Sequence, residues 1–130
     1  MTINEEEMGY LFLNRKKELK EQYRQMKPQM GILIIRSKAS NKCYIEATQD
    51  LKSKINSTKF KLGFGNHPNR DLQKEWKDYG EGNFTIDILD TLQYSEDEAK
   101  TDYTEDLALL QTIWEEKLLK ENVEFYGKRG

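Results

Sequence analysis

Few residues of this chain have the types and spacing that catalysis or metal binding would require. The sequence holds one cysteine, Cys43, and one histidine, His67, so it cannot supply a metal site built from several such ligands. The glycine-rich segment 63–66 is not followed by Gly-Lys-Ser/Thr, which excludes a P-loop. No Ser-His-Asp arrangement is indicated. Cys43 is best interpreted as a small buried thiol, and His67, which precedes a proline, as a turn residue.

One polar side chain, Gln111, falls on the apolar face of an expected helix. Leu107 lies four residues before it and Trp114 three residues after it, so all three share a face at about 100° per residue. A buried amide without hydrogen-bond partners would cost about 1–3 kcal/mol. Gln111 must therefore be hydrogen-bonded, or lie where this face opens into a cleft. A structural glutamine and a remnant of a polar site both fit the pattern.

The first half of the chain predicts a helix followed by a hairpin. Asn4 and Glu7 form a capping-box pattern that begins a helix of about residues 5–26, which ends before Pro28. The apolar run 32–35 predicts a buried strand, and a second strand returns from Cys43 to Ala47 after a tight turn.

The second half predicts helices around one further strand. Residues 50–57 are weakly helical, and Asn69 caps a helix that ends at Gly80. Residues 84–89 alternate as a strand, and after an acidic loop Thr104 can cap a final helix that continues to about residue 120.

This order of elements predicts an α+β fold, with a small three-stranded antiparallel or mixed sheet flanked by helices and an extra N-terminal helix. We expect an N-terminal helix in residues 1–28, one domain in residues 29–121 and a C-terminal tail in residues 122–130.

Charge is divided unevenly along the sequence. Residues 36–77 carry ten Lys/Arg against four acids, whereas residues 78–121 carry thirteen acids against three lysines. Such asymmetry can mark a phosphate-facing surface beside an acidic one, and two solvated faces explain it equally well. The net charge of −2 argues against avid non-specific DNA binding.

Several classes of protein are disfavoured. No apolar run approaches the ~20 residues of a membrane span, and acidic residues 5–7 replace the basic start of a signal peptide. A single cysteine allows no internal disulfide. We therefore expect no membrane association and a reducing, bacterial-type cytoplasmic location.

Two short motifs resemble a known superfamily. Gly31-Ile32-Leu33 on the first strand and Tyr44-Ile45-Glu46 on the second resemble the paired motifs of the GIY-YIG nucleases. Downstream, the segment NRDLQKEWKDYG (69–80) resembles the helix before the third strand of that domain, and the final helix is similar as well. The resemblance covers about residues 29–121. It implies a GIY-YIG-like fold and the activity of that superfamily, which is cleavage of nucleic-acid phosphodiesters with a divalent metal.

The resemblance implies four active-site positions, most of which differ here. A tyrosine on each hairpin strand falls on Leu33 and Tyr44, and an arginine falls on Lys54, which keeps the charge but not the bidentate fork. A metal-binding glutamate falls on Gln111, whose neutral amide is a poorer Mg²⁺ ligand. Glu46 replaces the terminal glycine of the second motif.

Tyr44, Lys54 and Gln111 thus mark the catalytic positions of a degenerate site with no metal ligand, Leu33 being a lost tyrosine. We expect no cofactor and no acidic oxygen beside Tyr44 able to hold Mg²⁺. Magnesium would be required only if the chain is nevertheless a nuclease.

Three functions fit these residues. The favoured one is a pseudoenzyme that binds nucleic acid without cleaving it, through Tyr44, Lys54 and a further set of side chains: Lys52, Lys59, Lys61 and His67. The second is a divalent-metal-dependent DNA endonuclease with atypical site residues. The third is a protein-interaction domain whose first helix packs on a protein partner or on a second copy of the chain.

Overall fold

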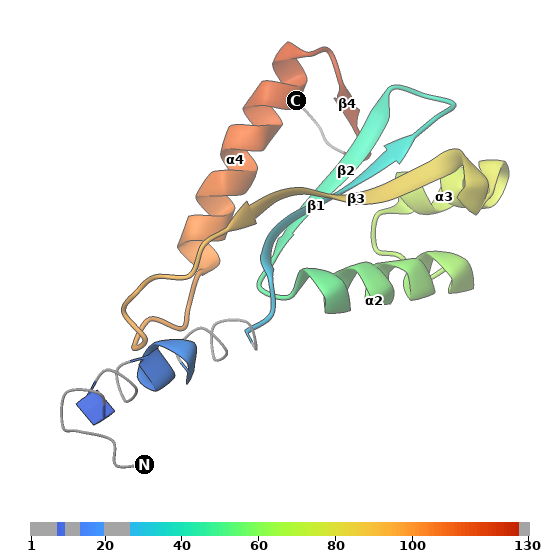
Figure 1. Cartoon of the computed structure of the whole chain (residues 1–130). Helices are drawn as coiled ribbons and strands as arrows, with labels where there is room; N and C mark the ends of the chain where they lie inside the picture. The colour runs from blue at the N-terminus through green and yellow to red at the C-terminus, as the bar shows by residue number, and fades with distance from the viewer. Residues whose placement is uncertain (1–7, 10–13, 20–26, 128–130) are drawn as a thin grey trace.

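A four-stranded mixed sheet forms the centre of the fold, which is shown in Figure 1 as a computed structural model that describes residues 8–9, 14–19 and 27–127. The strands are β1 (Met30–Ser37), β2 (Lys42–Thr48), β3 (Phe84–Leu92) and β4 (Glu124–Phe125), in the order β3-β1-β2-β4. β1 pairs antiparallel with β2 and β3, and β2 pairs parallel with β4.

The predicted α+β class is confirmed, but the expected sheet is one strand short. β4 comes from residues 122–130, which the sequence predicted to be a tail. A two-residue strand has no alternation of apolar and polar positions by which it could be recognised. Tyr126, the next residue, is buried in the core against β1 and the helices, so this segment packs onto the domain.

Helices cover both faces of the sheet. α2 (Leu51–Phe64) and α3 (Arg70–Tyr79) lie on one face, and α4 (Thr104–Lys120) lies on the other (Figure 1). A short 3₁₀ turn, Glu81–Asn83, joins α3 to β3. Because successive side chains of β1 point to opposite faces, Leu33 and Ile35 pack toward α2 and α3, whereas Ile32 and Ile34 pack toward α4.

Gly31 is required by the close approach of β3. A Cβ at this position would lie 2.0 Å from the carbonyl oxygen of Asp90 and 2.7 Å from the Cα of Thr91. The register between the two strands shifts between Ile32 and Leu33, next to this contact. Only a residue without a side chain fits here, so the first residue of the first motif has a role in packing.

The helix ends follow local rules that the sequence revealed only in part. Asp50 caps α2 by accepting a hydrogen bond from the Ser53 amide at 3.1 Å, and Asn69 caps α3 by accepting one from the Leu72 amide at 3.1 Å. α2 extends seven residues beyond the expected residue 57. Thr104 is the first residue of α4 and not its cap, and its hydroxyl bonds the Asp102 carboxylate instead.

The predicted N-terminal helix of residues 5–26 lies largely outside the described residues; within it, residues 14–19 are helical and exposed. None of the helices in the described part of the chain is long and apolar enough to cross a membrane.

Candidate functional site

The candidate site is centred on β2, where two polar side chains share the face that packs against α2 and α3. Tyr44 and Glu46 are two residues apart on a strand, so both point to this face. Leu33 of β1 lies directly opposite Glu46 in the strand register and is fully buried in the core. The position that the resemblance assigns to a first tyrosine is therefore occupied by a packed aliphatic side chain.

Glu46 holds both of the neighbouring functional groups. Its Oε2 accepts a hydrogen bond from the Tyr44 hydroxyl at 3.1 Å, and its Oε1 lies 3.0 Å from the Nζ of Lys54 on α2. The side chains of Lys54 and Glu46 are 34% and 27% exposed, so the ion pair lies at the edge of the core. We expected no acidic oxygen beside Tyr44, and this expectation is wrong because Glu46 supplies one.

His67 is the fourth member of this group, which with Tyr44, Glu46 and Lys54 we call the Tyr44 group. Its ring meets the ring of Tyr44 edge-on with centroids 5.1 Å apart, and the residue is only 4% exposed. The backbone amide of Asn69 donates to its Nδ1 at 3.0 Å, which leaves the proton of the neutral ring on Nε2. Gln73 fixes the loop, since its Oε1 accepts from the His67 amide and its Nε2 donates to the Leu62 carbonyl. A polar loop sequence gave no sign of this burial.

The environment keeps both rings of the group neutral. Burial raises the pKa of Tyr44 well above its usual range, and the charge and hydrogen bond of Glu46 raise it further. Burial also lowers the pKa of His67, an effect that the negative charge of Glu46 partly opposes. Tyr44 is therefore a protonated phenol that donates its hydrogen bond to Glu46.

Gln111 is satisfied by structural hydrogen bonds. Its Oε1 accepts from the Ala47 amide of β2 at 3.2 Å, and its Nε2 donates to Oε1 of Glu115 at 3.2 Å. These contacts tie α4 to β2 on the face opposite to Tyr44. These hydrogen bonds agree with the interpretation of Gln111 as a structural glutamine.

The remaining predicted binding residues lie on α2. This helix contains four lysines and no acidic residue. Lys52 and Lys59 are exposed and Lys61 is partly exposed. Among the residues that the structure describes, Lys54 is the only lysine of α2 in an ion pair, which leaves the other three available to an anionic partner.

The side chains of the site that could face a metal ion are already engaged by protein groups. No group of three or more His, Cys, Asp or Glu side chains in the described ranges could hold an ion. The carboxylate of Glu46 is already engaged by an ammonium group and a phenol, and both ends of the Gln111 amide are engaged by protein atoms. A bound Mg²⁺ would compete with these partners for the carboxylate and amide oxygens.

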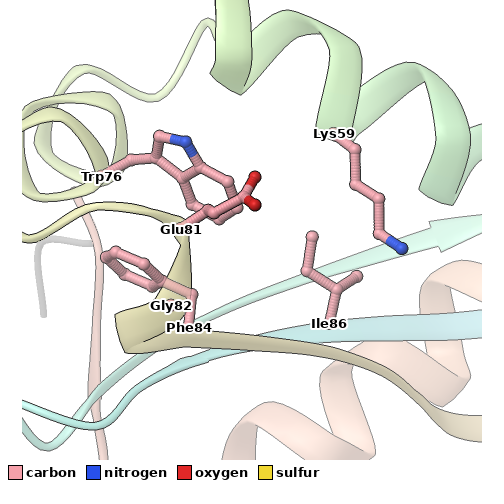
Figure 2. A pocket seen from close by; sticks show the side chains of 6 residues that line it. All are labelled: Lys59, Trp76, Glu81, Gly82, Phe84 and Ile86. Atoms are coloured by element: carbon pink, nitrogen blue, oxygen red, sulfur yellow. The ribbon is translucent and has the colours of Figure 1, made fainter.

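A pocket lies elsewhere on the same face, beside β3. It has a volume of about 460 Å³ and is lined by Lys59, Trp76, Glu81, Gly82, Phe84 and Ile86. Figure 2 shows Lys59 above Ile86 on one side and the Trp76 ring with Glu81 on the other. The rings of Trp76 and Phe84 stack with centroids 5.0 Å apart. None of Tyr44, Glu46, Lys54 and His67 lines this pocket.

Comparison of the sequence with known protein families and with characterised proteins finds no match. Comparison of the structure finds the catalytic domain of the homing endonuclease I-TevI, at a TM-score of 0.59 and 19% identity over 76% of this chain and 99% of that one. A mutant of the same catalytic domain is similar over 78% and 99%, with the same TM-score and identity. At this identity the likeness shows the fold: the chain has the GIY-YIG-like fold that its two short motifs predicted.

Proposed function

We propose that this chain is a nucleic-acid-binding domain that has the fold of a GIY-YIG catalytic domain and lacks its cleavage activity. The observation that carries the proposal is the position of Glu46. One carboxylate holds the Tyr44 hydroxyl at 3.1 Å and the Lys54 ammonium at 3.0 Å. The resemblance assigns Tyr44 and Lys54 to phosphodiester cleavage, and here both side chains are bound to the Glu46 carboxylate. That acid would also repel an approaching phosphate.

The lysines of α2 support the binding part of the proposal. Lys52, Lys59 and Lys61 form no ion pair within the described part of the chain, and the helix has no acidic residue to neutralise them. Contacts from three lysines to phosphates predict a slope of log K against log salt of about −2 for a single strand and −3 for a duplex.

The first experiment measures binding and cleavage together. Fluorescence anisotropy of a labelled 20-mer, single-stranded and duplex, is recorded between about 50 and 200 mM salt. The double variant Lys59→Glu/Lys61→Glu should bind at least tenfold more weakly, because two attractive contacts become repulsive. The matched control is Lys117→Glu/Lys120→Glu, which makes the same charge change on α4 and should bind nearly as the parent does. Undetectable or salt-independent binding by the parent chain would refute the proposal.

A second candidate is a metal-dependent endonuclease, favoured by the acid that Glu46 places beside Tyr44 and His67. It predicts cleavage of labelled single-stranded, duplex or branched DNA in Mg²⁺ or Mn²⁺, with loss of activity in Glu46→Ala. We expect no products from the parent chain. Products that disappear in Glu46→Ala would replace the first proposal with this one.

A further inference from the structure

Two phenylalanine side chains of α2 are exposed side by side. Phe60 is 65% exposed and Phe64 is 69% exposed, and their ring centroids lie 4.5 Å apart with planes inclined at 31°. The two residues are four apart on the helix, so both project from the same ridge. Exposed aromatic rings do not gain the favourable free energy of burial. Single exposed apolar residues are common on protein surfaces, whereas an adjacent pair forms an apolar patch of the kind that marks interaction sites.

The ridge lies between two rows of lysines. At about 100° per residue, Lys52 and Lys59 fall on one side of Phe60, and Lys54 and Lys61 fall on the other, each roughly 80–120° away from it. The rest of the ridge is short and polar: Ser53, Asn56 and Ser57. The buried residues Leu51, Thr58 and Leu62 face the sheet, so the ridge points away from the domain; in Figure 1 no other labelled element lies on that side of α2.

We propose that this ridge of α2 binds single-stranded nucleic acid, with bases stacked on Phe60 and Phe64 and phosphates contacting the flanking lysines that form no ion pair within the described residues, Lys52, Lys59 and Lys61. The inference rests on the proposed nucleic-acid binding and specifies its surface and ligand. Unpaired bases expose π-faces that stack on aromatic side chains, whereas the bases of a duplex are already stacked on one another. Hydroxyl and amide groups along the ridge can bond base edges.

Charge and polarity select this ligand over two others. A second copy of the chain would bring the same four lysines against these lysines, which opposes a symmetric contact through α2. A membrane surface would favour a continuous apolar face, and this ridge carries three polar residues followed by two rings. A polymer with both negative charge and planar rings matches the lysine rows and the phenylalanine pair together.

The test compares strands by anisotropy, using labelled oligo-dT of 15 nucleotides and a mixed-sequence duplex of 15 base pairs. We expect Phe60→Ala/Phe64→Ala to weaken oligo-dT binding at least tenfold and duplex binding less than threefold, with an unchanged salt slope because the lysines remain. Phe60→Tyr/Phe64→Tyr should retain oligo-dT binding. The matched control is Leu109→Ala/Leu119→Ala, which removes two exposed apolar side chains from α4.

The outcomes separate this inference from the proposed function. If the parent chain binds neither oligonucleotide, the proposed function fails and the inference fails with it. If the parent binds both and the alanine variant leaves oligo-dT binding unchanged, or weakens both strands equally, only the inference fails. A parent that is dimeric by light scattering and becomes monomeric in the alanine variant would assign the ridge to self-association. Binding of the parent to phosphatidylserine vesicles that the variant loses would assign it to a membrane surface.

Discussion

Removing the negative charge of Glu46 should release Lys54 from its ion pair, so that Lys54 can make an additional phosphate contact. In Glu46→Gln the amide oxygen can still accept from Tyr44, so the main loss is the ion pair with Lys54 at 3.0 Å. Because both side chains are about one-third exposed, this pair contributes only about 0–1 kcal/mol to the free energy of unfolding. The variant should therefore fold nearly as well as the parent chain.

The expected gain in affinity follows from one freed lysine. If Lys54 joins the phosphate contacts, the slope of log K against log salt becomes steeper by about 0.7–0.9, which corresponds to about five- to eightfold tighter binding at 0.1 M salt. The matched control is Glu116→Gln, which removes one exposed negative charge from α4 on the other face of the sheet. It should leave the slope unchanged.

The same sample gives an independent measurement of the network. His67 is the single histidine of the chain, so one NMR titration reports its pKa without ambiguity. Since the charge of Glu46 opposes the lowering caused by burial, the pKa of His67 should fall further in Glu46→Gln. An unchanged salt slope together with an unchanged His67 pKa would refute the view that Glu46 restrains Lys54 and acts on His67.

Four further predictions concern stability and reactivity. The pKa of His67 is lowered below its usual 6.5, so the free energy of unfolding should fall as pH drops below about 6.5, and His67→Asn should remove this component in denaturation experiments at a series of pH values. Gly31→Ala should destabilise the fold by about 1–3 kcal/mol because its Cβ would overlap β3, whereas Gly63→Ala, with open space around it, should not; thermal unfolding distinguishes them. Burial raises the pKa of Cys43 to about 11, so a disulfide reagent at pH 8 should label the thiol only after unfolding, and rapid labelling of the folded chain would contradict its burial. Tyr126→Ala should cost about 3 kcal/mol or more, measured by urea unfolding, against little for the exposed Tyr79→Ala; equal effects would mean that residues after 122 are a dispensable tail.

The elements with strong local signals were predictable from the sequence. The hairpin, the helix capped by Asn69 and the final helix were all expected close to where they lie, because apolar spacing and caps act within a few residues. α2 was underestimated because four lysines, serines and a glycine blur its apolar face. β4 was missed because its pairing with β2 is set by contacts distant in sequence.

The candidate site was predictable only where strand alternation applies. Tyr44 and Glu46 are two residues apart on a strand, so their position on one face could be predicted from the sequence. The contact of Glu46 with Lys54 depends on how α2 packs on the sheet, and that of Tyr44 with His67 depends on a loop held by Gln73. Neither arrangement has a periodic pattern that would reveal it.

The contact between Gly31 and β3 bears on how enzymes of this shape should be told apart from inactive chains. The glycine is required by the neighbouring backbone whether or not the chain cleaves a substrate, and Ile32 and Ile45 are buried in the core. A motif search that scores these three residues therefore detects the fold and not the activity. A search for active enzymes would do better to score positions 44, 46 and 54, where the residues needed for catalysis differ from those needed for packing.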